Sequence, residues 1–194
     1  GLAEMTRMGI PVPPGFTITT EACIEYFKEK QFPKGMFEEA KAALKQVEKI
    51  KKEQFGDPVN PLLVSVRSGA RASMPGMMDT VLNLGLNDQT VIGLIKKSQN
   101  ERFAYDAYRR FVAMFGTIVM GVHRERFDEA LEALSQANHN QKKIAGTPAP
   151  SDTRLPAHQL KELVETFKKI VLKEAGRPFP EDPIEQLRLA IAAV

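Results

Sequence analysis

The chain has 194 residues, 43% of them hydrophobic and 26% charged, and its net charge is only +3. This length suffices for one domain or two small lobes with a substantial core, and the composition excludes a fully disordered chain. A single cysteine, Cys23, excludes an internal disulfide and a cysteine-based metal cluster. The sequence therefore favours a reducing, cytoplasmic setting.

Basic and acidic residues are interleaved along the chain, as in residues 37–52 and 161–173. Such runs are typical of solvated helix faces, whereas a nucleic-acid binder gathers its basic residues on one face. No apolar run reaches the length of about 18 residues that spans a membrane, and no signal peptide is visible. The sequence thus predicts neither a nucleic-acid partner nor a membrane. Because the chain starts without methionine and stops in an apolar run, we expect both ends to be cuts.

The first part of the chain mixes helix and strand signals. Residues 2–8 indicate the end of a helix, stopped by Gly9 and the prolines that follow. Residues 16–19 form a short β-prone run, and Thr20 is a candidate cap for a second helix. Residues 37–52 carry apolar side chains at helical spacing with charged residues between them, which predicts a third helix.

Two strands are expected next. Residues 62–66 form a short, β-branched apolar run entered from Pro61, which predicts a strand buried in a sheet. Residues 80–84 are the second strand candidate. From about residue 87 the sequence is helical, so we expect a mixed α/β lobe over 1–90 and a helical subdomain over 91–194.

The helical part contains several distinct segments. Residues 101–122 predict a long helix with one apolar face, made of Phe103, Ala107, Phe111, Met114 and Ile118. We further expect a helix over 127–134, a loop over 138–155, a helix over 159–173 that Gly176 ends, and a helix start at Asp182-Pro183-Ile184-Glu185. In that start Asp182 caps, Pro183 suits the first position and Glu185 reaches back to the cap.

The segment that carries chemistry runs from Ser65 to Thr80, where the chain leaves the predicted buried strand. It passes through small residues, Arg67, Arg71 and glycine-containing turns. Small residues let backbone N–H groups approach an anion, and arginine offers a fork of donors that suits phosphate oxygens. By composition alone, a polar connecting loop with arginine ion pairs and gap-filling methionines is the favoured interpretation.

The exact string changes that interpretation. Residues 65–80 and 82–88 closely resemble a signature of the pyruvate phosphate dikinase family. Other blocks resemble the family in the same order: Leu2-Ala3-Glu4-Met5, residues 9–20, residues 100–111, Leu160-Lys161-Glu162-Leu163, Pro178-Phe179-Pro180 and Pro183. The resemblance covers almost the whole chain and is weakest over 123–158.

The resemblance implies an α+β fold, part of an ATP-grasp-like nucleotide-binding region. Members of the family convert ATP, pyruvate and phosphate into AMP, phosphoenolpyruvate and pyrophosphate. Arg67 is similar to the family's ATP-site arginine, whose implied role is to stabilise charge on the transferring phosphates. The implied ATP and phosphate site consists of Arg67, Ser68, Gly69, Ala70, Arg71, Ser73, Met74, Pro75, Gly76, Met77, Met78, Asp79 and Thr80.

The resemblance also implies parts that this chain lacks. The family places a Gly-Gly-Lys-Gly segment, with a phosphate-binding lysine, just before the stretch that begins at Leu2, and Gly1 stands where the family tends to have another residue. The acidic ligands of Mg²⁺, in the second ATP-grasp half, are expected beyond Val194. A phosphohistidine domain, a pyruvate-binding domain and a homodimeric parent are implied as well. We therefore expect the chain to help bind ATP without being catalytically complete.

Alternatives remain open at this point. Phosphoenolpyruvate synthases and glucan water dikinases share the general architecture, but they resemble a different string at residues 73–79. A non-catalytic nucleotide-binding or protein-binding module is a further hypothesis. The three histidines, His123, His139 and His158, match no catalytic position of the family. Asp106 and Glu101 lack a third metal ligand at suitable spacing.

Overall fold

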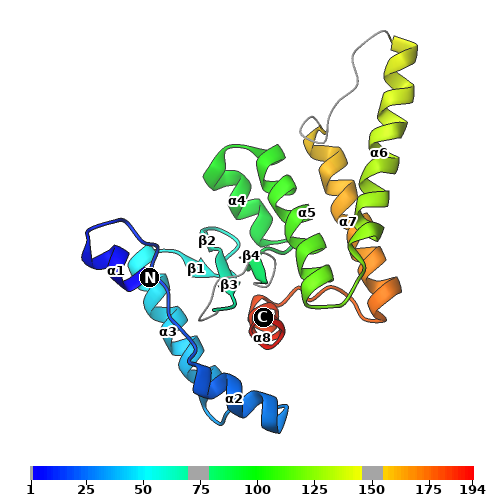
Figure 1. Ribbon diagram of the computed structural model, residues 1–194. Helices are drawn as coiled ribbons and strands as arrows, with labels where there is room; N and C mark the ends of the chain where they lie inside the picture. The colour runs from blue at the N-terminus through cyan, green and yellow to red at the C-terminus, as the bar shows by residue number, and fades with distance from the viewer. Residues whose placement is uncertain (1, 70–78, 146–154) are drawn as a thin grey trace. The chain divides into compact units, whose positions relative to one another are not determined.

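The computed structural model describes residues 2–69, 79–145 and 155–194, with the backbone only for residues 2, 3 and 137–145. The chain divides into two compact units, Gly1–Gln54 and Phe55–Val194 (Figure 1). The described residues form helices and short strands, so the predicted α+β class is confirmed. None of their helices is long and apolar enough to cross a bilayer.

The first unit contains the helices α1 (Leu2–Arg7), α2 (Thr20–Glu29) and α3 (Met36–Lys51). The predicted strand over residues 16–19 is wrong, because this segment has no regular structure and its last residue, Thr19, is the N-cap of α2. The predicted cap residue, Thr20, is the first helical residue instead. The α3 helix confirms the apolar periodicity, with Ala40, Leu44 and Val47 buried.

The second unit begins with four strands: β1 (Gln54–Phe55), β2 (Pro61–Leu62), β3 (Val64–Arg67) and β4 (Thr80–Leu84). They form two sheets of two strands each, β1 with β2 and β3 with β4. The expected buried strand over 62–66 is wrong in two ways. It is divided between β2 and β3, and β3 alternates between half-buried and exposed residues, as expected for a hairpin with one packed face. The strand predicted at 80–84 is confirmed as β4.

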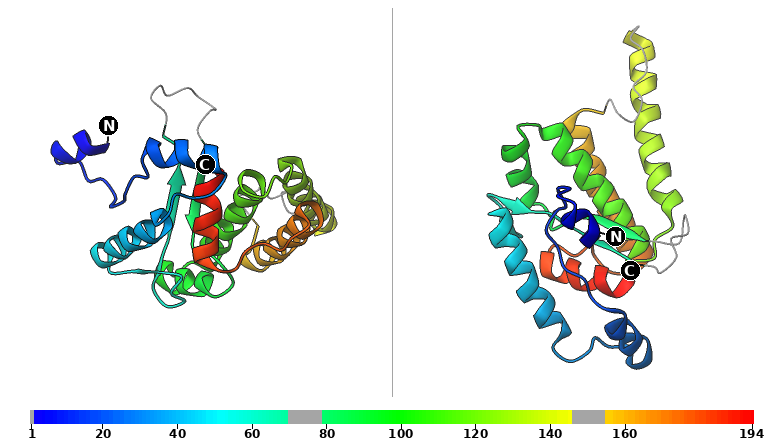
Figure 2. Two further views of the ribbon diagram at one scale, coloured as in Figure 1. Left: turned by 90° about the horizontal axis from the view of Figure 1, so that it is seen from below. Right: turned by 60° about the vertical axis from the view of Figure 1, so that its left-hand side comes forward.

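Beyond β4, every regular element of the described residues is helical, as predicted. These elements are α4 (Thr90–Ser98), α5 (Glu101–Ile118), α6 (Arg124–Ala145), α7 (Ala157–Ala175) and α8 (Pro183–Ala193). The α5 and α7 helices pack side by side, and α8 lies alongside the β3–β4 hairpin (Figures 1 and 2). Gly176 ends α7 with a φ of 68°, as predicted.

The predicted apolar face of α5 is wrong at Phe103 and only half-buried at Ala107, Met114 and Ile118, while Phe111 is buried as expected. Phe103 is 52% exposed, and the buried stripe includes Ala104, Tyr108, Phe111 and Phe115. The predicted stripe and the buried stripe both follow helical spacing. In the sequence, alanine and tyrosine give the buried stripe a weaker apolar signal than Phe103 and Met114 give the predicted stripe. Phe111 and Phe115 pack edge-on against Phe179, with ring centres 5.6 and 5.4 Å apart, so this face forms the core.

The α6 helix corrects a second prediction. The expected loop from residue 138 begins too early, because the helix continues to Ala145. Residues 138–145 are polar but contain neither glycine nor proline, and the first such helix breaker is Gly146. Residues 146–154, the rest of the predicted loop, lie outside the described residues.

The start of α8 confirms most of the predicted cap. A carboxylate oxygen of Asp182 accepts a hydrogen bond from the N–H of Ile184 at 3.0 Å, and Pro183 is the first helical residue. Glu185 does not fill its predicted role, since its carboxylate accepts two hydrogen bonds from Arg188, at 2.7 and 2.6 Å. Those bonds lower the pKa of Glu185.

Gly116 lies where α5, α6 and α7 meet, and a side chain there has no room. A Cβ atom on Gly116 would stand 2.7 Å from the Phe127 ring and 3.2 Å from a methyl group of Val171. We expect Gly116→Ala to destabilise the chain by about 1–3 kcal/mol through overpacking, despite a higher helix propensity. Urea unfolding measures the loss. Adding Phe127→Leu should restore part of the lost free energy of unfolding. If the effects of the two changes are purely additive, a steric clash is not the cause.

Candidate functional site

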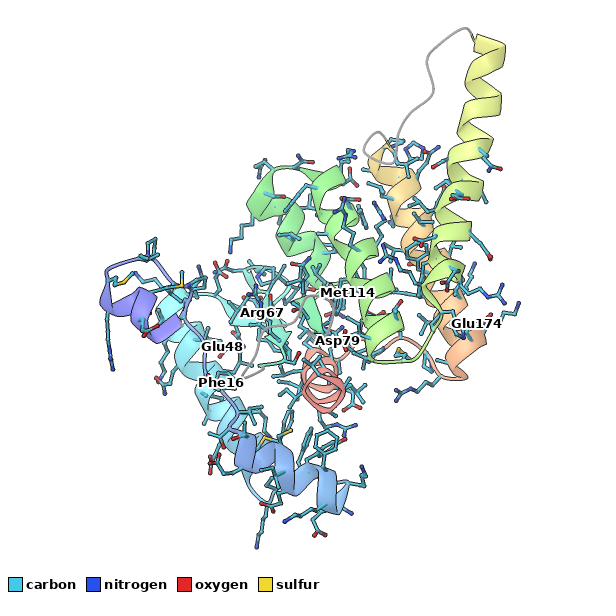
Figure 3. All side chains as sticks on the ribbon, in the orientation of Figure 1. Phe16, Glu48, Arg67, Asp79, Met114 and Glu174 are labelled. Carbon is cyan, nitrogen blue, oxygen red and sulfur yellow. The ribbon has the colours of Figure 1, made fainter. Side chains whose placement is uncertain are left out.

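Arg67 is the last residue of β3, at the end of the β3–β4 hairpin where residues 68–79 connect the two strands. The antiparallel register pairs Val66 with Val81 and Arg67 with Thr80. Val81 is fully buried, and because side chains alternate across a sheet, Arg67 and Thr80 lie on the opposite face. The hairpin therefore directs Arg67, which Figure 3 labels, away from the packed side.

An irregularity in β4 keeps both ends of the hairpin packed. The register shifts by one residue between the pairs Val66–Val81 and Val64–Leu84. Asn83, within that shift, has a φ of 61°, a left-handed conformation that asparagine tolerates well. This bulge returns Leu84, as well as Val81, to the buried side of the strand.

The guanidinium group of Arg67 is exposed, and within the described parts of the chain it has no ion-pair or hydrogen-bond partner. Its five N–H donors are therefore available to a ligand. A planar fork of donors at a strand end suits the oxygens of a phosphate or carboxylate, which it can bind with two hydrogen bonds.

Ser68 and Asp79 join the two strands just beyond the Arg67–Thr80 pair. The backbone N–H and the hydroxyl group of Ser68 both donate to the carbonyl oxygen of Asp79, at 3.1 and 3.2 Å. The Asp79 side chain is exposed, and Thr80 is half-buried. A Cβ atom on Gly69 would meet no atom within 4 Å. The structure thus gathers these predicted residues beside Arg67 at one end of the hairpin.

The remaining residues of the predicted site lie outside the described residues. They are Ala70, Arg71, Ser73, Met74, Pro75, Gly76, Met77 and Met78. The described part of the site therefore consists of the end of β3, the start of β4 and the residues next to them.

At the far end of β4, the buried side chain of Gln186 joins the hairpin to α8. Its carbonyl oxygen accepts a hydrogen bond from the N–H of Gly85 at 3.0 Å. Its amide group donates to the carbonyl oxygens of Leu86 and Pro180, both at 2.9 Å. Gln186 itself is fully buried, and its bonds satisfy backbone groups of buried Gly85 and Leu86 and of half-buried Pro180.

Asn87 and Thr90 secure the turn between β4 and α4. The side-chain oxygen of Asn87 accepts from the N–H groups of Gln89 and Thr90, at 2.9 and 2.8 Å. The Thr90 hydroxyl accepts from the Asn87 N–H at 2.8 Å and donates to the Gly85 carbonyl at 2.7 Å. The turn is therefore closed by reciprocal bonds of the kind that begin a helix.

Next to this turn, Lys168 of α7 joins three segments. Its ammonium nitrogen lies 2.7 Å from a carboxylate oxygen of Asp88 and 2.6 Å from one of Glu181. The Tyr108 hydroxyl donates to the same Asp88 oxygen at 3.0 Å, and the ammonium group lies 5.2 Å from the centre of the Tyr108 ring. Sequence reasoning missed this cluster, because Lys168 and Asp88 are 80 residues apart and each is an ordinary surface residue by type.

The cluster shifts the proton affinity of its members. Burial raises the pKa of the Tyr108 hydroxyl above its ordinary value, and the Glu181 and Asp88 carboxylates add to the shift. Burial opposes the charged form of Lys168, but hydrogen bonds to Asp88 and Glu181 outweigh it and raise the pKa of Lys168. Both groups hold protons more tightly in the folded than in the unfolded state. Their contribution to stability is therefore complete below about pH 10 and is lost as the pH rises further.

We accordingly expect the free energy of unfolding to fall as the pH is raised from about 10 to 12, and Tyr108→Phe to make that fall shallower. Urea unfolding at a series of pH values measures both. Tyr26→Phe, which removes a hydroxyl group in the first unit, is the matched control. If Tyr108→Phe leaves the pH dependence of the free energy of unfolding unchanged, the loss of stability at alkaline pH comes from other groups.

No metal site is found among the described side chains, where no group of three histidine, cysteine or acidic residues could hold an ion. Asp106 lies 2.8 Å from buried Arg109 and 3.0 Å from Arg110, so its carboxylate is held by arginines. His123 and His158 are exposed. Among the predicted site residues that the structure describes, Arg67 is the one whose side chain suits an anion by chemical type.

The chain is similar over its whole length to much longer enzymes. It is 54% identical over 194 residues to "Pyruvate, phosphate dikinase, chloroplastic" of Mesembryanthemum crystallinum, covering 19% of that protein. It is 49% identical over 193 residues to the pyruvate, phosphate dikinase of Giardia intestinalis and 50% identical over 195 residues to that of Entamoeba histolytica, covering 21% of each.

No protein-family model matches the chain. The curated relatives nevertheless cover all of it, and the chain spans about one fifth of their length. The matched region therefore includes both strands of the Arg67 hairpin and the helices that support it. Over the part of the enzyme that it spans, the chain belongs to the pyruvate, phosphate dikinase family.

Proposed function

We propose that this chain is part of the ATP-binding region of a dikinase that converts ATP, pyruvate and phosphate into AMP, phosphoenolpyruvate and pyrophosphate. The observation that carries the proposal is the identity of about half of all residues to enzymes named pyruvate, phosphate dikinase. The exposed Arg67, at the end of a strand and without a partner among the described residues, supports it as an anion-binding group.

In this proposal Arg67 stabilises the negative charge that develops on the transferring phosphates, since phosphoryl transfer depends on positioning and electrostatics. The other proposed ATP and phosphate contacts are Ser68, Gly69, Ala70, Arg71, Ser73–Met78, Asp79 and Thr80. Ser68 also joins the two strand ends, because its N–H and its hydroxyl group both donate to the Asp79 carbonyl. The ATP-grasp-like fold belongs to the same proposal.

The remaining machinery is proposed to lie elsewhere in a longer polypeptide. It comprises the second ATP-grasp half with the acidic ligands of Mg²⁺, the phosphohistidine domain and the pyruvate-binding domain, in a homodimer. Mg²⁺ would supply positive charge to the ATP phosphates. The chain alone is then expected to contribute to ATP binding without completing the reaction.

Two organisational predictions stay predictions. One is the division into a mixed lobe over 1–90 and a helical subdomain over 91–194. The other is the cytoplasmic setting. The name of the Mesembryanthemum crystallinum relative, in contrast, contains the word "chloroplastic".

The test uses the longer dikinase polypeptide, supplied with ATP, pyruvate and Mg²⁺, with and without phosphate. We expect AMP, pyrophosphate and phosphoenolpyruvate to form only when phosphate is present. Phosphoenolpyruvate formed without phosphate would assign the protein to the water dikinases. No consumption of ATP would favour a non-catalytic binding module.

A further inference from the structure

The first unit leaves an unusual share of apolar side chains uncovered. Of the thirteen large hydrophobic side chains exposed among the described residues, seven lie within residues 1–54. In α2 no residue is buried, and Ile24 and Phe27 are 56% and 64% exposed. Because exposure is measured with the whole unit in place, no other described element of the first unit covers these side chains.

Three exposed residues of α2 form one surface. Cys23 and Phe27 are four residues apart in α2, and Ile24 and Phe27 are three apart, so all three lie on the same side of the helix. Cys23 is exposed like its two neighbours. We call this surface, made of Cys23, Ile24 and Phe27, the α2 face.

The α2 face is held in place by a row of aromatic rings on another side of the helix. The ring of Tyr26 lies 5.3 Å from that of Phe32, which stacks at 6.0 Å on the ring of Phe37 in α3. This row fixes α2 against the start of α3. A rigid apolar surface loses little conformational entropy when a partner binds, which favours association.

Charges of both signs border the α2 face, with exposed Glu21 three residues before Ile24 and two lysines near Phe27. The ammonium group of Lys30 lies 5.4 Å from the centre of the Phe27 ring, and Lys28 is the exposed residue that follows Phe27. Interfaces typically have an apolar centre and a polar rim with complementary charge. The partner surface that fits is therefore apolar at its centre and charged at its edge, with carboxylates opposite Lys28 and Lys30.

The second unit offers no matching stripe among its described residues. Its six exposed large hydrophobic side chains lie in six different segments, so no helix there carries two of them. The relatives, in contrast, are about five times as long as this chain. We propose that the α2 face binds a part of the dikinase polypeptide outside residues 1–194, an inference that rests on the proposed function.

Carbodiimide cross-linking of the longer enzyme tests the proposal, since this reagent joins lysines directly to carboxylates in contact with them. We expect Lys28 or Lys30 to be linked to aspartate or glutamate residues outside 1–194, as identified by mass spectrometry. Lys45, exposed on α3, is the control. Links only to residues 55–194, or only between isotope-labelled and unlabelled copies, would overturn the proposal in favour of the second unit or a second copy.

Cys23 provides an independent readout on the same face. In the native longer enzyme we expect its alkylation to be at least about tenfold slower than in urea, because the partner covers it. Phe27→Asp should restore fast alkylation, and Glu25→Gln, outside the α2 face, should leave it slow. Equally fast alkylation in native and unfolded enzyme would show that the face is open to solvent.

The two experiments are separable from the test of the proposed function. Cross-links and alkylation rates need no turnover. An enzyme that makes phosphoenolpyruvate but lacks the expected links would overturn only the inference about the α2 face. An enzyme with the links but without dikinase activity would overturn only the proposed function.

Discussion

Replacing Arg67 by alanine in the longer dikinase should lower the rate of pyrophosphate formation by about 100- to 1,000-fold, the usual loss when one donor that stabilises transition-state charge is removed. The Arg67 side chain is exposed and has no partner among the described residues, so the same change should leave the free energy of unfolding nearly unaltered. Steady-state kinetics and urea unfolding of the same preparation measure the two effects.

Two further variants sharpen this prediction. Arg67→Lys keeps the charge but loses the planar fork, so we expect it to recover only part of the activity. Arg110→Ala removes another exposed arginine, one that binds Asp106 on α5, and should keep nearly full activity. If Arg67→Ala retains activity within about twofold of the unaltered enzyme, Arg67 does not take part in phosphoryl transfer.

The largest expected effect on stability is that of Gln186→Leu. Leucine cannot form the three hydrogen bonds of Gln186, so the Gly85 N–H and the Leu86 and Pro180 carbonyl groups would lose their partner inside the protein. We expect the free energy of unfolding to fall by about 3–5 kcal/mol, since buried polar groups without partners each cost a substantial part of their hydration. Urea unfolding measures the change.

Gln46→Leu makes the same chemical change at an exposed position of α3 and serves as the control. It should alter the free energy of unfolding by no more than about 0.5 kcal/mol. A loss for Gln186→Leu that matches this control would mean that water or a local shift satisfies the three backbone groups.

Local signals in the sequence were sufficient for most of the elements. The β4 strand has the bounds of the strand candidate at 80–84, and Asp182 and Gly176 mark the expected helix ends. Each of these features depends on residues a few positions apart. The β3 strand ends at Arg67, one residue beyond the predicted end at Val66, and its exposure was not predicted.

Features that depend on distant residues were not predictable. The apolar face of α5 could be read in two ways, and only packing against α7 selects the stripe that contains Tyr108. Gln186 and Lys168 look like ordinary helix residues in the sequence, yet both bind the segment after β4 across 80 or more residues. Their roles follow from the three-dimensional arrangement and leave no local pattern.

The hydrogen bond between Gly85 and Gln186 spans 101 residues, which sets an order of events during synthesis. The β3–β4 hairpin leaves the ribosome first, and at about 5–20 residues per second its partner on α8 follows about 5–20 seconds later. A two-stranded hairpin alone is marginally stable in water. Until α8 emerges, Val81 and Leu84 have no complete cover, so the hairpin that ends at Arg67 waits for its native support.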